Sequence, residues 1–290
     1  FSILSIIISM SALLLYSHSN TFFGILRTLP VNINVNWHVV TTVTSLPILL
    51  HLYYHSQNEK IQYSSIATGI FCLFVILATG SRIGILLIFI WIFSMSVLDH
   101  GRYFGWKHTL TISRLMIFLG GVIILPSLIY NPEFFGRLVI TSQEEFEYIV
   151  TGSLNSPGPT RSRIYLGTAV LLQNINILTT GVGFANFNIV FEQIPQTEFM
   201  YSPHNIFVKF LIELGIVGLI LITMSLLIPI KYGMNVIIDV RRSVTRSRTV
   251  AVLWGYILFL IYSLFQPSLF HPHLYILSGL LFSLYMIEND

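Results

Sequence analysis

Charged residues are scarce in this chain. Asp, Glu, Lys and Arg make up only 9% of its 290 residues, whereas hydrophobic residues make up 54%. A soluble globular protein carries about 25% charged residues, so this chain cannot cover a surface that faces water. The composition excludes a soluble enzyme and a nucleic-acid binder. It predicts an all-α polytopic membrane protein, because helices are the only open-ended elements that cross lipid.

Cysteine and metal-binding motifs are also nearly absent. Cys72 is the one cysteine and lies in an apolar run, which excludes an intrachain disulfide and a disulfide scaffold. The sequence has no HExxH, no CxxC and no paired-carboxylate motif, so metal catalysis has no support. We therefore expect neither a metal ion nor another cofactor.

Long apolar runs are what the chain has instead. At ~20 residues per span, its length accommodates about eight transmembrane helices. We predict them at 1–16, 37–54, 61–79, 83–98, 112–130, 204–230, 249–266 and 271–287. The sequence begins inside the first run, without the basic region and cleavage site of a signal peptide, which indicates an N-terminal truncation.

The spans divide the chain into three parts. Residues 1–130 hold transmembrane helices 1–5, residues 131–203 form one large external loop, and residues 204–290 hold helices 6–8. Basic residues concentrate on the other side of the membrane, above all in 231–248, so that side is cytoplasmic by the positive-inside rule. Within the external loop, the amphipathic segment 161–178 predicts a helix that lies at the membrane interface.

Arginine and histidine gather at the external side, at or near span ends. These residues are Arg27, Arg82, Arg161, Arg163, His204, His271 and His273. Acidic residues are absent from mid-span except for Glu213, which forms an i,i+4 pair with Lys209. An ion pathway normally needs ionisable groups at depth, so the pattern favours a site at the outer face. The alternative for an isolated arginine or histidine there is a snorkelling anchor or interfacial packing.

Three segments resemble the signature blocks of the O-antigen ligase and polysaccharide polymerase superfamily. They read TGSRIGILL at 79–87, RIYLGTAVLLQNINILTTGVGFANF at 163–187, and HNIFVKFLIELGIVGLILI at 204–222. The His-Asn block is the most specific of them and the Ser-Arg block the least. Members are polytopic glycosyltransferases that use lipid-diphosphate-linked sugars at the outer face of the bacterial inner membrane. The resemblance therefore implies a multi-pass inner-membrane protein whose active site faces the periplasm.

The resemblance also implies roles for particular residues. His204 matches the family's essential histidine, which makes it the candidate general base, and Arg82 and Arg163 match arginines that would hold the diphosphate. The family usually has an aromatic residue four positions after the loop arginine, where this chain has Gly167, so Arg161 stays an alternative to Arg163. The further candidates for substrate binding are Arg27, Asn205, Gly181 and Gly183. GVGFANF at 181–187 is not a dinucleotide loop, because it lacks the third glycine and a βαβ context.

The reaction that the resemblance implies transfers a glycan from an undecaprenyl-diphosphate-linked donor to a sugar hydroxyl. The acceptor is a lipid A-core in a ligase, a lipid-linked repeat unit in a polymerase, or a protein in a variant of the ligase reaction. The shared blocks do not separate these acceptors. Two other classes stay open: a transporter of lipid-linked sugars or small solutes, and a non-catalytic membrane subunit.

Overall fold

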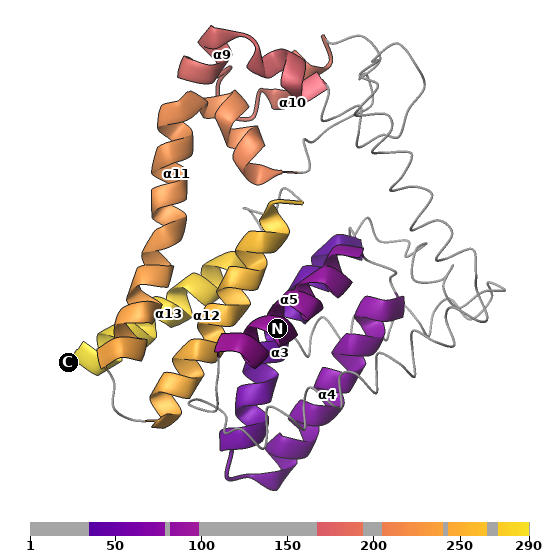
Figure 1. The fold of residues 1–290 in the computed structure, drawn as a ribbon, viewed down its shortest axis with the longest axis vertical. Coiled ribbons are helices and arrows are strands. Elements are labelled where there is room, and N and C mark those ends of the chain that lie inside the picture. Colours follow the sequence, from indigo (N-terminus) through magenta and orange to yellow (C-terminus); the bar gives the residue numbers. More distant parts are fainter. Residues whose placement is uncertain are drawn as a thin grey trace, which may run out of the picture. The chain divides into compact units, whose positions relative to one another are not determined.

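The computed structural model describes six stretches of the chain, and all are dominated by α-helix. They are 35–78, 82–98, 167–193, 205–239, 243–265 and 272–289. No residue within these stretches forms a β-strand (Figure 1). The chain divides into two compact units, one made of 1–119, 229–262 and 270–290, the other of 120–228 and 263–269.

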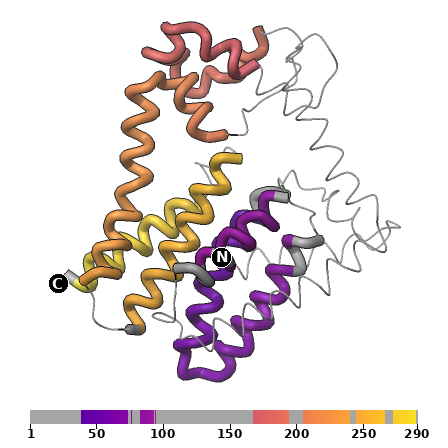
Figure 2. The backbone as a smooth tube through the Cα atoms, viewed as in Figure 1, coloured from indigo at the N-terminus to yellow at the C-terminus, as the bar shows by residue number. Residues whose placement is uncertain are grey.

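The first unit begins with a helical hairpin. Helices α3 (Val35–His55) and α4 (Glu59–Ala78) pack against each other and are joined by a short turn, which is visible in the indigo and purple part of Figure 2. Asn58 ends this turn as the N-cap of α4, since its side-chain oxygen accepts the backbone N–H of Lys60 at 2.9 Å. Helix α5 (Arg82–Leu98) follows.

The C-terminal helices complete the first unit. Helix α12 (Ser243–Ser263) packs closely against α3 at Gly255. A Cβ added to Gly255 would come within 2.7 Å of the Thr44 carbonyl oxygen. At the other end of the same contact, His51 and Ser247 form a side-chain hydrogen bond of 3.0 Å. Helix α13 (Pro272–Asn289) packs against the last turns of α11, where Tyr232 meets two aromatic rings of α13. A close glycine contact and a buried polar pair thus join α12 to α3.

Six of the predicted spans fall almost entirely within the described residues, and each of them consists mainly of helix there. The spans predicted at 1–16 and 112–130 lie outside those residues. Two described helices are long and apolar enough to cross a membrane, Ile206–Asp239 and Val244–Ser263, and Ile83–Ile92 is a shorter apolar helix. The helical class and two candidate membrane spans are therefore established, while the full set of eight spans stays a prediction.

Two predicted connections differ in length from the structure. Most of the basic stretch 231–248, predicted to lie between two spans, is helical, because α11 (Ile206–Asp239) runs through its first half and α12 begins at Ser243. Apolar residues such as Val236 and Ile237 alternate with its polar ones and are buried, which favours helix over loop. The connection before the last span is longer than predicted: α12 ends at Ser263 instead of residue 266 and α13 starts at Pro272, a favoured first helical residue, with His273 buried in its first turn.

Candidate functional site

Helix α11 contains a sharp break in the middle of the His-Asn block. Gly215 has φ 67° and ψ −172°, so a short helix, Ile206–Leu214, ends there and a long apolar helix begins at Ile216 (Figure 1). The span predicted at 204–230 is therefore interrupted near its beginning, and its continuous apolar helix starts at Ile216. The run of apolar residues continues across Gly215, so the break is visible only in the backbone geometry.

The short helix begins at Asn205. The Asn205 backbone carbonyl accepts the N–H of Lys209 at 3.0 Å. Its side-chain oxygen accepts the N–H groups of Phe207 at 3.0 Å and Val208 at 3.1 Å. These contacts define an N-cap, in which a side chain satisfies the N–H groups that the first turn leaves without partners. Asn205 thus fixes the start of the helix directly after His204 in the sequence.

The end of the short helix is completed by the loop that contains the two candidate glycines. A helix leaves its last carbonyl groups without intrahelical partners. Here the N–H of Val182 donates to the Ile212 carbonyl at 2.9 Å, and the N–H of Gly183 donates to the Glu213 carbonyl at 2.8 Å. The Gly181 N–H donates to Ile177 at 3.0 Å and ends helix α9 (Ile175–Thr180). The N–H groups of both glycines are therefore engaged within the protein.

Two glycines allow these segments to cross backbone against backbone. A Cβ on Gly181 would lie against the Glu213 carbonyl and 2.6 Å from the Leu214 nitrogen. A Cβ on Gly215 would lie against the Thr179 carbonyl oxygen and 2.9 Å from the Thr180 nitrogen. Gly181 (φ 73°, ψ 178°) and Gly215 both occupy a backbone region that is essentially restricted to glycine. Two of the sequence blocks thus form one packed structure.

Glu213 adds a side-chain link to the same crossing. Its residue is 1% exposed, and its Oε1 accepts the N–H of Phe187 at 3.4 Å, in the first turn of α10 (Phe187–Phe191). Lys209 Nζ lies 3.7 Å from the same oxygen, which confirms the predicted i,i+4 pair. Glu213 Oε2 is buried without a hydrogen-bond partner. No local sequence pattern predicts the contact with Phe187, which is 26 residues away.

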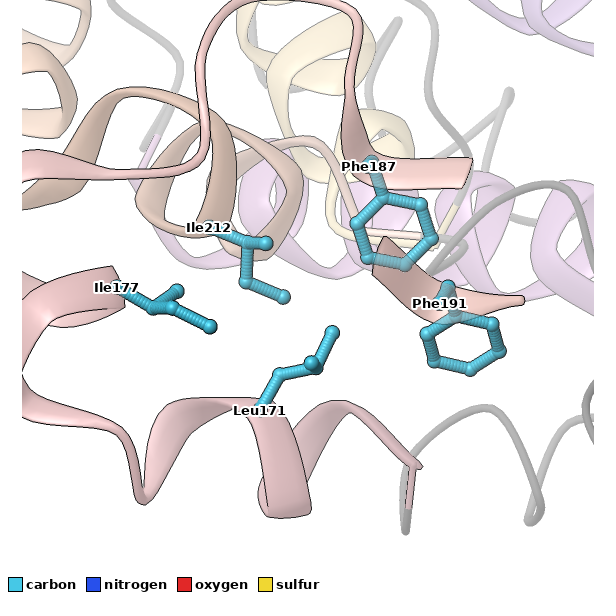
Figure 3. Packing of buried hydrophobic residues seen from close by; sticks show 5 residues of the cluster. All are labelled: Leu171, Ile177, Phe187, Phe191 and Ile212. Carbon is cyan, nitrogen blue, oxygen red and sulfur yellow. The ribbon is translucent and has the colours of Figure 1, made fainter. Parts of the chain in front are cut away.

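Apolar side chains from four segments form a core between the short helix, α9 and α10. Figure 3 shows Leu171, Ile177, Phe187, Phe191 and Ile212 converging on one cluster. The rings of Phe187 and Phe191 stack with centroids 5.0 Å apart. Burial of each such side chain stabilises a fold by about 1.5–3 kcal/mol. The cluster therefore holds the short helix firmly against α9 and α10.

The amphipathic segment 161–178 is not one helix over the part that the structure describes. A helical turn covers 167–172, and α9 begins anew at Ile175. Asn174 separates them, because its side-chain oxygen accepts the Asn176 N–H at 3.0 Å and caps α9. This bend turns both Leu171 and Ile177 into the same cluster.

The structure describes only part of the predicted site. Arg82 is the first residue of α5. Arg27, Arg161, Arg163 and His204 lie outside the described residues. Gly181 and Gly183 are brought to the far end of the short helix from Asn205, roughly 13 Å along its axis at 1.5 Å per residue. In the part that is described, no group of three His, Cys, Asp or Glu side chains could hold a metal ion.

The helical architecture and the apolar helices indicate a membrane protein, with a broken helix and a glycine crossing at its most distinctive sequence block. Residues 67–223 match the family described as O-antigen ligase, which is more than half of the chain. The chain belongs to the O-antigen ligase family. No curated protein matches it closely enough to count as a relative. All the candidate residues except Arg27 lie within the matched range, and membership indicates a role in polysaccharide biosynthesis.

Removal of the Lys209 ammonium tests whether the buried Glu213 carboxylate depends on it. We expect Lys209→Met to destabilise the folded protein by about 1–3 kcal/mol, the range for a buried polar group that loses its partner. The partial exposure of Lys209, 28%, favours the lower half of this range. The apparent melting temperature of the purified protein in detergent measures the effect.

The double variant Lys209→Met/Glu213→Leu supplies the control. Because it removes the carboxylate together with its partner, it should be more stable than Lys209→Met alone. A double variant whose melting temperature fell by the sum of the two single losses would show that the pair is not coupled.

Proposed function

We propose that this protein is a membrane glycosyltransferase of surface polysaccharide biosynthesis, which moves a glycan from an undecaprenyl-diphosphate donor to a sugar hydroxyl at the outer face of the inner membrane. The observation that carries the proposal is the family match over 67–223, which spans all three signature blocks. The packing of the glycine loop against the helix that begins after His204 supports it.

The proposed step is a displacement at the anomeric carbon of the donor sugar. The acceptor hydroxyl oxygen forms a bond to that carbon, and the bond from the carbon to the diphosphate oxygen breaks. The electron pair leaves with the undecaprenyl diphosphate. Arg82 and Arg163, or Arg161 in place of Arg163, hold the departing charge, since a guanidinium offers paired, permanently charged donors to phosphate. This stabilisation requires no metal ion.

The proton of the acceptor hydroxyl goes to the His204 imidazole. A sugar hydroxyl is a weak nucleophile until a base accepts its proton, and an unperturbed histidine is largely neutral at pH 7. Such general base catalysis typically contributes ~10²–10⁴ in rate. We assign Arg27 to substrate binding from its predicted external position alone.

The position of the helix break favours an enzyme over a transporter. Transporters bind their substrates at mid-membrane, between the halves of discontinuous helices. In α11 the break at Gly215 lies at the beginning of the exposed apolar stretch, which starts with Ile216 and Val217. Only a short helix precedes it. A break at the end of a span suits a site at the membrane face.

A transfer assay in detergent micelles tests the enzyme class directly. The purified chain is incubated with an undecaprenyl-diphosphate glycan and either a lipid A-core or a second lipid-linked repeat unit. We expect a lengthened acceptor and release of undecaprenyl diphosphate in equal amounts. Micelles have no compartments, so transport alone yields no product. An absence of product with both acceptors and with the donor intact would contradict the proposal.

Complementation in cells selects the acceptor. The chain is expressed in one host that lacks its glycan ligase and in another that lacks its polymerase, and surface glycan is measured at matched membrane expression. Restored attachment to lipid A-core in the first host assigns a ligase. Restored chain length in the second assigns a polymerase.

A further inference from the structure

The short helix Ile206–Leu214 is fixed along its length and at its far end. Ile206, Phe210 and Ile212 are buried. The far end is bonded to Val182 and Gly183 and crossed by α9. A helix held in this way has a fixed axis, and the position of its N-terminal turn then depends on its cap, Asn205.

Asn205 controls that turn through its side-chain oxygen. The oxygen accepts two backbone N–H groups, from Phe207 and Val208, and the Asn205 carbonyl accepts a third, from Lys209. Without the cap, these first-turn N–H groups would have no partner in the protein, and the turn would fray as they formed hydrogen bonds to water. Fraying would release the backbone at the residue joined to Asn205, which is His204.

We propose that Asn205 is a positioning residue: by capping the short helix it holds the backbone of His204 in place for catalysis. The inference rests on the proposed function for the role of His204, but the cap itself does not. It gives Asn205 a different task from the substrate binding that its place beside the histidine predicts. Since the side-chain oxygen is already shared by two N–H groups, any contact with substrate would have to use the amide nitrogen.

Four substitutions separate positioning from binding. Ser and Asp are as good N-caps as Asn but lack the amide nitrogen, whereas Gln keeps the amide and Ala keeps neither. We expect Asn205→Ser to retain KM and kcat. We expect Asn205→Ala and Asn205→Gln to lower kcat by ~10–100-fold with KM little changed, which is the cost of a misplaced catalytic group. Transfer in detergent by the full chain measures both constants.

The pH profile provides a readout that a purely structural role would not move. Asn205→Asp keeps the cap but places a negative charge next to His204, which favours the imidazolium. We expect this variant to reach the activity of the wild type at high pH and to lose activity at a higher pH than the wild type on acidification. An unchanged profile would mean that residue 205 does not act near the catalytic base.

Asn174 offers a matched control, because it caps α9 in the same way. Asn174→Ala should lower the melting temperature while the kcat of the folded fraction stays at the wild-type value. If Asn174→Ala reduced kcat as much as Asn205→Ala, the effect would be general destabilisation and the proposal would be wrong. If Asn205→Ser raised KM and Asn205→Gln did not, the amide would bind substrate instead.

Amide hydrogen exchange tests the cap even where no acceptor supports transfer. Exchange at Phe207 and Val208 should accelerate in Asn205→Ala and Asn205→Gln and stay slow in Asn205→Ser. Equal exchange in all of these variants would overturn the proposal. A failure of transfer in the wild type, with the exchange pattern as expected, would instead count against the proposed function.

Discussion

Replacing Gly215 with alanine is expected to prevent the protein from folding into a stable form. The dihedral angles of Gly215, φ 67° and ψ −172°, alone cost a residue with a side chain about 1–3 kcal/mol. The added Cβ would also meet backbone atoms of Thr179 and Thr180, which cannot rotate away as a side chain could. The combined loss should exceed about 4 kcal/mol, the level at which single substitutions become exceptional. Size-exclusion profile and melting temperature in detergent measure it.

Gly181→Ala should have an effect of similar size, because it separates the same two backbones from the opposite side. The double variant should be little worse than either single variant, since one added methyl group already forces the crossing apart. Additive losses would show that the two glycines act independently.

Two other helical glycines provide controls for the substitution itself. A Cβ on Gly69 in α4 or on Gly279 in α13 would meet nothing within 4 Å. Because alanine is favoured over glycine inside a helix by about 1 kcal/mol, both variants should be as stable as the wild type or slightly more stable. A Gly215→Ala protein that behaved like these two would contradict the crossing.

The helices could be predicted from the sequence because lipid-crossing segments require long apolar runs, and such runs are easy to recognise. The break in α11 could not. Gly215 has apolar residues on both sides. A glycine inside a helix is tolerated often enough that it does not by itself predict a break. The break depends on α9, whose last turn approaches Gly215 from more than thirty positions earlier in the chain. A contact of that kind is decided by tertiary packing, which local patterns do not encode.

The caps show a different limit. Asparagine before an apolar run is a recognised signal for a helix start, and both Asn174 and Asn205 have this place. The sequence therefore contained the break within 161–178, although the amphipathic pattern across it suggested one helix. The same signal predicts the capping role of Asn205, but its position beside His204 favoured substrate binding instead. Glu213 is intermediate: its pairing with Lys209 follows from spacing, but its bond to Phe187 depends on the crossing.

Replacing His204 with alanine is expected to lower kcat by ~10²–10⁴ while the protein stays inserted and folded. The arginines would still bind the donor diphosphate, so the KM for the donor should change little. His55→Ala, a histidine of α3 in the other unit, serves as the control and should retain kcat. Transfer in detergent at saturating donor and acceptor provides the measurement.

The pH dependence then identifies the role of the side chain. If His204 is the base, wild-type kcat should fall on acidification as the imidazole is protonated, which for an unperturbed histidine happens at a pH of about 6.5. His204→Ala should lack that fall, because its remaining activity uses no titrating base, and added imidazole should restore part of the rate at pH above this value. A His204→Ala protein with full activity would remove the base assignment. A strongly reduced activity with the wild-type pH profile would instead place His204 in binding, because the titrating group would then lie elsewhere.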